Sequence, residues 1–293
     1  MKIKFQYQLT LISLMLLSSF QLLAQDKFGG LALYTVREDM ALDPESTLQN
    51  VADIGYQYVE AAGYKDRKFY GMEPVEFKNY LKEVGLIPLS SHQSTVTLEN
   101  ADEMIADVKA AGFEYFVVPI PPMGLYIKDP DTKERGFTGG AANLAAILDI
   151  LGEKCYKAGL KLLYHNHDFE FKKDTDGIVP IEYLLENCNP KYVNFQMDLF
   201  WVSKVGVDPV VYFKKYPGRF KLWHVKDMDL EGNFAPVGSG TIDFTRILEQ
   251  KSLSGMEYYY VEQDTTFHEK PIEAIKISHE GLKKIGFDKV QKL

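Results

Sequence analysis

The sequence is poor in cysteine and has no excess of basic residues. Its 293 residues include two cysteines, Cys155 and Cys188, so at most one disulfide can form and a disulfide-stapled scaffold is excluded. We expect both to be buried thiols on helices. The formal net charge is −8, which argues against a nucleic-acid partner. No linker or change of composition divides the chain, so we expect one domain.

The first 24 residues have the pattern of a signal peptide. In MKIKFQYQLTLISLMLLSSFQLLAQ, Lys2 and Lys4 precede an apolar stretch that ends in small and polar residues. We predict that residues 1–24 are a leader cleaved after Ala24, and that a mature domain over 25–293 is exported to the periplasm or secreted, without membrane attachment. The alternative is an N-terminal membrane anchor. Interrupting Ser and Gln residues and the short apolar length disfavour it.

The chain does contain a repeated pattern, in which an amphipathic helix is followed by a glycine and a short apolar run. LQNVADIGYQYVEA, IADVKAAGFEYFVVP and LGEKCYKAGLKLLYH each follow it. A glycine after a helix takes the left-handed conformation that turns the chain into the next strand. Nearly continuous apolar runs are typical of parallel strands that are buried on both faces. The expected strands lie near 29–36, 56–61, 86–92, 113–120, 160–167, 191–198, 219–226 and 256–262.

Eight strand-then-helix units in one domain predict an α/β fold, the (β/α)₈ or TIM barrel, with a last helix near 271–285. A doubly wound open sheet is the alternative. No glycine-rich phosphate-binding fingerprint follows the first expected strand, which disfavours that alternative. In a TIM barrel the active site lies at the carboxyl-terminal ends of the strands, so the residues at those ends are the first candidates for a functional site.

Nearly every expected strand ends in a charged or imidazole side chain, although such groups rarely end buried apolar runs unless something pairs with them. In YHNHDFEF, His165 and His167 share one face because residues i and i+2 of a strand point the same way. Groups on the last four strands form a mixed nitrogen and oxygen set. This set suits Mn²⁺ first, with Co²⁺, Zn²⁺ or Mg²⁺ as alternatives, better than Ca²⁺ or a thiolate zinc. The strand-end residues are Glu60, His92, His165, His167, Asp198, His224, Lys226 and Glu262.

Taken singly, these residues also have structural interpretations. A lone glutamate after a strand is as often a helix cap or an ion-pair partner as a ligand. His92 alone fits a hydrogen-bonded wall residue, and Lys226 fits an ion pair with Asp227 or Glu262. The metal interpretation therefore depends on the strand-end groups meeting at one rim of the barrel.

With HVKD and the later VGSGTIDF, the strand-end series resembles the sugar phosphate isomerase/epimerase superfamily, the xylose isomerase-like barrels that also include endonuclease IV. The resemblance covers essentially the whole mature chain. Many relatives have a glutamate where this chain has His165, or His167 if the strand is longer. The resemblance implies a divalent metal at the ends of strands five to eight, held by His165, Asp198, His224 and Glu262.

The chemistry that we expect is metal-assisted removal of a proton next to a carbonyl, through an enediolate. Glu262, or Glu170 across the pocket, is the expected carboxylate for proton transfer, and His167 is the expected imidazole. Lys226 would stabilise charge on the substrate's oxygens. Ketose 3-epimerases have a substrate-binding histidine at the position of Trp201 in this chain. We expect the indole of Trp201 to stack on a sugar ring. The expected substrate-binding residues are Glu60, His92 and Trp201.

Export and the isolation of Lys226 among the strand ends point to an unphosphorylated sugar. We therefore predict a metal-dependent isomerase or epimerase of a keto-sugar. The alternative is a 3-keto-glycoside lyase or hydratase, which needs one base and one acid. The ketose 3-epimerases that the chain resembles use two metal-binding glutamates as bases, and only Glu262 of that pair is present here, which suits the alternative. A non-catalytic sugar-binding barrel is the second alternative, which metal analysis would separate. Six histidines and the negative charge disfavour a phosphodiesterase of the endonuclease IV type. The resemblance also allows a homo-oligomer.

Overall fold

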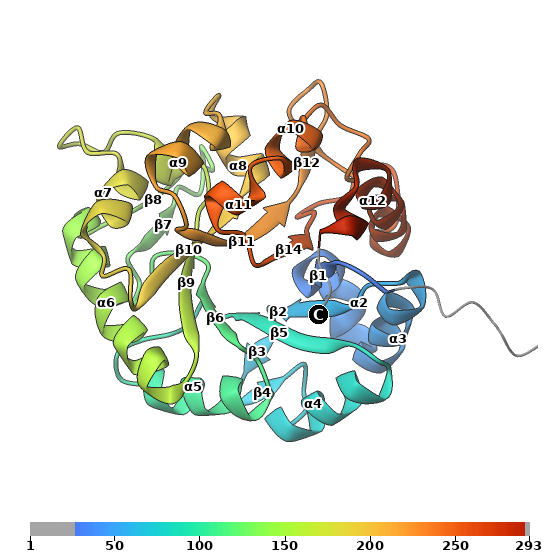
Figure 1. Ribbon diagram of the computed structural model, residues 1–293. Coiled ribbons are helices and arrows are strands. Elements are labelled where there is room, and N and C mark those ends of the chain that lie inside the picture. Colours follow the sequence, from blue (N-terminus) through green and yellow to red (C-terminus); the bar gives the residue numbers. More distant parts are fainter. Residues whose placement is uncertain (1–26, 291–293) are drawn as a thin grey trace, which may run out of the picture.

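The computed structural model describes residues 27–290, so the expected signal peptide lies outside the described residues. Eight parallel strands close into a barrel in the order β1-β14-β11-β10-β9-β6-β5-β2. The longer helices form a ring around it (Figure 1). Each barrel strand falls within one of the expected ranges, which confirms the (β/α)₈ barrel. The barrel strands are β1 Gly30–Ala32, β2 Tyr58–Ala61, β5 Ile87–His92, β6 Tyr115–Val118, β9 Lys161–His165, β10 Val193–Asp198, β11 Phe220–Val225 and β14 Tyr258–Val261.

Several of the described helices end at a glycine stop signal. Gly55, Gly159 and Gly286 each have a left-handed φ directly after a helix, as expected for glycine caps. The last long helix matches its expected range, and no described helix is long and apolar enough to cross a membrane. The helices are α2 Arg37–Leu42, α3 Pro44–Ile54, α4 Pro74–Glu83, α5 Ala101–Ala110, α6 Gly140–Ala158, α7 Pro180–Asn187, α8 Leu199–Lys204, α9 Pro209–Lys215, α10 Phe244–Leu248, α11 Lys251–Ser254 and α12 Pro271–Ile285, with 3₁₀ turns η1 Leu33–Val36, η2 Phe169–Phe171 and η3 Phe287–Lys289.

The apolar core has two layers. A large cluster lies between the barrel and its helices, and a small one fills the barrel interior with residues such as Tyr58, Tyr115 and Tyr260. A Cβ on Gly30 would lie 2.3 Å from the ring of Tyr58, so only glycine lets these rings meet inside the barrel. Both cysteines are free and buried as expected, Cys155 in α6 and Cys188 directly after α7.

Three short hairpins follow barrel strands and therefore stand at the carboxyl-terminal end of the barrel. They are β3 Tyr64–Lys65 with β4 Lys68–Phe69, β7 Tyr126–Lys128 with β8 Arg135–Phe137, and β12 Asp227–Met228 with β13 Phe234–Ala235. The helix-and-strand pattern of the sequence predicts none of them. Two of the three supply side chains to the site described next.

The VGSG segment is held by a buried aspartate. The side-chain oxygens of Asp227 accept backbone N–H hydrogen bonds from Gly238, Gly240 and Ile242 at 2.9–3.2 Å. A Cβ on Gly240 would lie 2.3 Å from Asp227 Oδ1, so the loop needs a glycine there to approach so closely. Asp227 is thus a loop anchor, and the ion pair of Lys226 with Asp227 does not form.

Candidate active site

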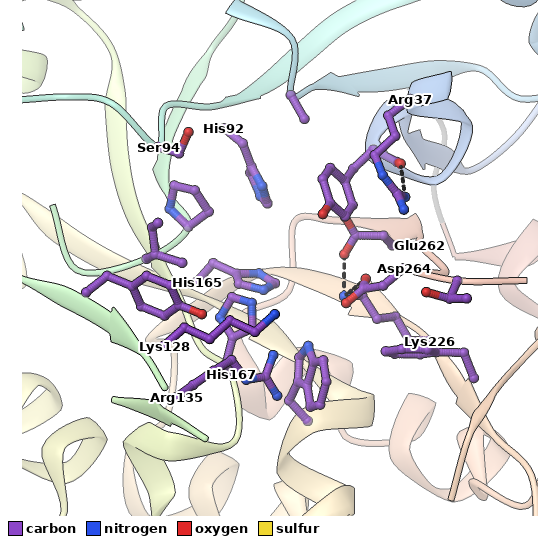
Figure 2. A pocket seen from close by; sticks show the side chains of 18 residues that line it. Arg37, His92, Ser94, Lys128, Arg135, His165, His167, Lys226, Glu262 and Asp264 are labelled. Carbon is purple, nitrogen blue, oxygen red and sulfur yellow. Dashed lines mark hydrogen bonds and ion pairs between the residues drawn. The ribbon is translucent and has the colours of Figure 1, made fainter. Parts of the chain in front are cut away.

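A cavity of about 550 Å³ opens at the carboxyl-terminal ends of the barrel strands (Figure 2). Several sequence-predicted site residues line it: His92, His165, His167, Trp201, Lys226 and Glu262. Four others are fully buried and do not line it: Glu60, Glu170, Asp198 and His224. The structure therefore divides the predicted site into a wall that a substrate can contact and a buried layer behind that wall.

His224 lies in the buried layer between two carboxylates. Its Nε2 is 2.6 Å from Glu60 Oε1, and its Nδ1 is 2.7 Å from Glu262 Oε2. Both ring nitrogens must carry a proton to donate to both oxygens, so His224 is an imidazolium here. Burial alone would lower its pKa, but the charges of Glu262 and Glu60 outweigh burial and raise the pKa to about 10.

Glu60 organises the buried layer. Its carboxylate accepts hydrogen bonds from Ser90 Oγ, from Gln196 Nε2 at 2.8 Å and from His224, and it lies 2.9 Å from His92 Nε2. Burial would raise the pKa of Glu60, but His92 and His224 hold the pKa well below its usual value. Sequence reasoning expected Glu60 to bind substrate. The structure instead places it beneath the histidines, with its oxygens occupied.

Lys226 reaches the cavity in the middle of three carboxylates. Its ammonium nitrogen lies 3.0 Å from Asp198 Oδ2, 2.5 Å from Glu262 Oε2 and 2.7 Å from Asp264 Oδ1. Burial would lower the pKa of Lys226, but these carboxylates, Asp198 first, raise it well above the usual value. The expected pairing with Glu262 is present. Asp264, which follows β14, was not foreseen.

The two oxygens of Asp198 have different surroundings. Oδ1 accepts the backbone N–H of Trp201 at 2.9 Å and so caps the start of α8. Among the described residues, Oδ2 makes no hydrogen bond of acceptable geometry, although Lys226 balances its charge. Burial raises the pKa of Asp198, opposed by Lys226 and His224.

Two further histidines share one acceptor. Oε1 of Gln196 lies 2.9 Å from His92 Nε2 and 3.0 Å from His165 Nδ1. His165 Nε2 is 3.7 Å from Asp198 Oδ2. Burial, reinforced by repulsion from the neighbouring histidines, lowers the pKa of His165 well below its usual value. Gln196 was missed by sequence reasoning, although it lies two residues before Asp198 and so shares its face of β10.

His167 stands at the cavity wall, and Glu170 stands behind it. Oε2 of Glu170 accepts the backbone N–H of His167 at 2.8 Å, and Oε1 accepts the hydroxyl of Tyr164 at 2.7 Å. Burial raises the pKa of Glu170 to about 8 and lowers that of His167 well below its usual value. Glu170 fixes the chain that carries His167. It does not face the cavity, where the sequence led us to expect it.

Trp201 lines the cavity, and one of its faces is covered. The guanidinium of Arg135 lies 3.9 Å from the ring centroid and pairs with Asp168 at 2.6 Å. From the sequence, Trp201 is expected to stack on a sugar ring, which stays a prediction. In the structure, a ligand would meet the Arg135–Trp201 stack, whose edge is packed by Phe234 with ring centroids 5.5 Å apart.

Lys226 is accompanied by other cations, contrary to the expectation from the strand ends alone. Arg37 after η1 and Lys128 and Arg135 on the β7–β8 hairpin also line the cavity, and Figure 2 shows them around its rim. None of the three stands at the end of a barrel strand, so the strand ends do not reveal them. Lys226 is therefore not an isolated cation, and its surroundings do not exclude a phosphate group.

The donor set fits a divalent metal by type and spacing. One ligand atom from each of Asp198, His224 and Glu262 lies within 4.8 Å of the others, and the same holds for His92, His165 and His224. Asp198 Oδ2 is a buried oxygen with lone pairs that no hydrogen bond uses within the described part of the chain. Mixed imidazole and carboxylate donors are typical ligands of Mn²⁺, Co²⁺ and Zn²⁺.

The sequence matches one protein family over most of its length. The family described as "Xylose isomerase-like TIM barrel" matches residues 48–284. Among curated proteins, an inosose dehydratase from Lacticaseibacillus casei is 28% identical over 142 residues, which are 41% of this chain and 47% of that protein. One from Clostridium tetani is 29% identical over 143 residues, 42% and 47% of the two chains. The chain thus spans about half the length of the curated relatives it matches.

Solved structures extend the similarity to nearly the whole chain. A sugar phosphate isomerase/epimerase from Parabacteroides distasonis superposes with a TM-score of 0.74 and 27% identity, covering 91% of this chain and 97% of its own. A structure of the IolI protein with a bound zinc atom has a TM-score of 0.66 and 16% identity, with 91% and 100% covered. The second likeness is one of fold.

Proposed function

Because the chain belongs to the xylose isomerase-like TIM barrel family, we propose that it is a metal-dependent enzyme that removes a proton next to the carbonyl of a polyhydroxylated ketone. One observation carries this proposal. Ligand atoms of Asp198, His224 and Glu262, at the ends of three successive barrel strands, cluster within 4.8 Å of one another. Glu262 lines the cavity and the other two lie directly behind it, beside a buried imidazole and an ammonium group that also line it.

The metal would be held by Asp198, His224 and Glu262, with His165 beside them. To bind, His224 would give up the proton that Nδ1 shares with Glu262, while Nε2 keeps its hydrogen bond to Glu60. Mn²⁺ is our first expectation, and Zn²⁺, Co²⁺ and Mg²⁺ are alternatives. When bound, a divalent cation supplies Lewis-acid polarisation of a carbonyl and a neighbouring hydroxyl oxygen. Glu60, which lies behind His224 and bonds its Nε2, would keep the ring of His224 oriented toward the metal.

His167 is the group best placed to take the proton. It lines the cavity, its lowered pKa keeps it neutral at neutral pH, and its Nδ1 has no hydrogen-bond partner among residues 27–290. Glu262 also lines the cavity, but Lys226 and His224 both bind it, and they hold its pKa well below the usual value against the effect of burial. Lys226 would face the oxygen on which negative charge develops.

Elimination fits this asymmetric site better than epimerisation. His167 would take the proton as the C–H bond breaks, a carbon–carbon double bond forms, and the β-hydroxyl leaves with a proton from Lys226 as water. The matched curated proteins are inosose dehydratases, which supports the dehydratase form of the predicted lyase alternative. An inosose is a polyhydroxylated cyclic ketone, the substrate class that we propose here.

Isomerisation or epimerisation is the second candidate. Two different proton carriers, His167 and Glu262, line the same cavity, and a 1,1-proton transfer needs two such groups. The similarity to the Parabacteroides distasonis isomerase/epimerase, which extends over nearly the whole chain, favours this candidate. The two candidates share their first step and differ in the product.

We propose a substrate without a phosphate group. Arg135 is paired with Asp168, and Lys226 is surrounded by three carboxylates, so these two cavity cations are already balanced. Phosphorylated ketones belong in the test panel because Arg37 and Lys128 also line the cavity. We also propose export from the leader pattern of residues 1–24, and export would bring the enzyme to free sugars. Mass spectrometry of the native protein tests this, because an intact Met1 would show that the leader is retained.

The test is product analysis with Mn²⁺-loaded protein and a panel of inosose, keto-sugars and their phosphates. A product lighter by one water supports elimination, and an isomer of equal mass supports the second candidate. Glu262→Gln should lose activity, and Glu257→Gln, at the opposite end of the same strand, should keep it. Ligand binding that is unaffected by chelation, without any turnover, would instead indicate a sugar-binding barrel.

A further inference from the structure

Gln196 is a fully buried amide in the middle of the site, with all its polar contacts on functional side chains. It lies on β10 beside His165 of β9, its partner in the strand register. Its Nε2 donates to Glu60 Oε2 at 2.8 Å. Its Oε1 faces His165 Nδ1 at 3.0 Å and His92 Nε2 at 2.9 Å. A carbonyl oxygen has two lone pairs, so it accepts both hydrogen bonds.

The direction of this chain of hydrogen bonds follows from Glu60. An ionised carboxylate only accepts, so the amide must turn its NH₂ group toward Glu60. The opposite orientation of the amide would set two acceptor oxygens against each other in a buried place, at a cost comparable to a lost charged hydrogen bond. The amide oxygen then points at His165, and Nδ1 of His165 must carry a proton.

We infer that Gln196 is a positioning residue that fixes the tautomer of His165, so that Nδ1 is protonated and Nε2 is left as a bare lone pair. Nε2 is the nitrogen nearer the carboxylate cluster, 3.7 Å from Asp198 Oδ2. Resting on the proposed function, this means that His165 is preset as a ligand or proton acceptor at the nitrogen where one is needed. A histidine whose Nε2 carried the proton could do neither.

The same amide constrains His92. Nε2 of His92 lies 2.9 Å from both Gln196 Oε1 and Glu60 Oε1, two acceptors, so Nε2 carries its proton. The ring of His92 stacks on that of His224 with centroids 5.3 Å apart, 13° from parallel. Glu60 and Gln196 thus set the protonation sites of both wall histidines that lie above them.

The test is ¹⁵N NMR of histidine-labelled full-length protein in the presence of a chelator, with His165 assigned from a His165→Asn variant. In the wild type, His165 should show the Nδ1–H tautomer. Gln196→Leu removes the acceptor and should give a mixture of tautomers or the Nε2–H form. Gln196→Glu, protonated so that its O–H replaces the amide donor toward Glu60, keeps an acceptor oxygen and should keep Nδ1–H. Gln93→Leu, at an equally buried glutamine that contacts Ser91, is the matched control and should change nothing.

A wild-type His165 protonated at Nε2, or an unchanged tautomer in Gln196→Leu, overturns the inference. If Gln196→Leu does not fold, the wild-type and Gln196→Glu spectra still decide it. Mn²⁺ affinity gives a second measurement, with a loss of about 10–100-fold expected in Gln196→Leu and recovery in Gln196→Glu. A wild type that binds no metal contradicts the proposed function, while the tautomer measurement decides this inference separately.

Discussion

Glu60 and His224, 164 positions apart in the sequence, meet at 2.6 Å behind the cavity wall. The contact joins the second strand of the barrel to the seventh, across the barrel interior. Glu60 is fully buried and bonded to four groups, so it holds the histidine arrangement from behind the cavity wall. The strand-end residues therefore lie in two layers, one lining the cavity and one buried behind it.

Asp198→Asn should weaken Mn²⁺ binding by more than about 10-fold, since loss of even an outer partner of a ligand costs that much. The fold should survive, because asparagine caps a helix as well as aspartate does and Lys226 keeps Glu262 and Asp264. Metal titration and thermal unfolding measure the two effects. The control is Asp208→Asn, which changes another helix-capping aspartate that does not line the cavity. Full metal affinity in Asp198→Asn would refute the ligand assignment.

His167→Gln should lower kcat by about 10²–10⁴-fold, the usual contribution of a general base. The proton acceptor must be neutral, and burial holds the pKa of His167 well below 6.5. Wild-type kcat/KM should therefore stay level as the pH falls through 6.5 and decline only at lower pH. A pH–rate profile measures this. An acid limb centred at 6.5 or above would contradict the assignment.

Glu170→Gln should alter the pH dependence of stability. With its pKa raised to about 8, folded Glu170 keeps a proton that the unfolded chain releases above pH 4.5. The free energy of unfolding of the wild type thus falls as pH rises from 4.5 to 8, by up to about 1.4 kcal/mol per pH unit from this group. In the variant, denaturant titrations should show a shallower fall. The control is Glu249→Gln, which changes an exposed glutamate and should fall as steeply as wild type. If the free energy of unfolding of Glu170→Gln fell with pH as steeply as in wild type and in Glu249→Gln, the raised pKa of Glu170 would be contradicted.

Ligand binding should change the intrinsic fluorescence through Trp201. The chain has two tryptophans, and only Trp201 lines the cavity, whereas Trp223 is fully buried and stacked on Phe213 with centroids 5.2 Å apart. Titration with inosose should shift the wild-type emission, and Trp201→Phe should abolish the shift. A shift that persists in that variant would place the ligand elsewhere.

The sequence predicted the barrel because its signals are local. Doubly buried strand runs repeat eight times, several of the helices between them end at a glycine, and the last helix was located to the residue. Strand-end position also brought Asp198, His224 and Glu262 together, with His165 close to His224, since parallel strands bring their ends to one rim. Their role as metal ligands stays a prediction.

The sequence pattern does not predict which strand-end residues are buried, nor which side chains the loops bring to the cavity. Whether Glu60 faces the cavity or lies under His92 depends on the tilt and stagger of the strands, which no local spacing encodes. Arg135 reaches Trp201 because a hairpin after β6 folds over the cavity. Gln196 had a usable signal, its place two residues before Asp198 on one strand face.

Solvent exchange tests the central claim most directly. Mn²⁺-loaded protein is incubated in D₂O with inosose and the keto-sugar panel, and the reaction is followed by ¹H NMR. In at least one compound or its product, the proton on the carbon next to the carbonyl should be replaced by deuterium. Chelation and His167→Gln should suppress the exchange. Loaded protein that exchanges no such proton in any compound that it binds would contradict the account.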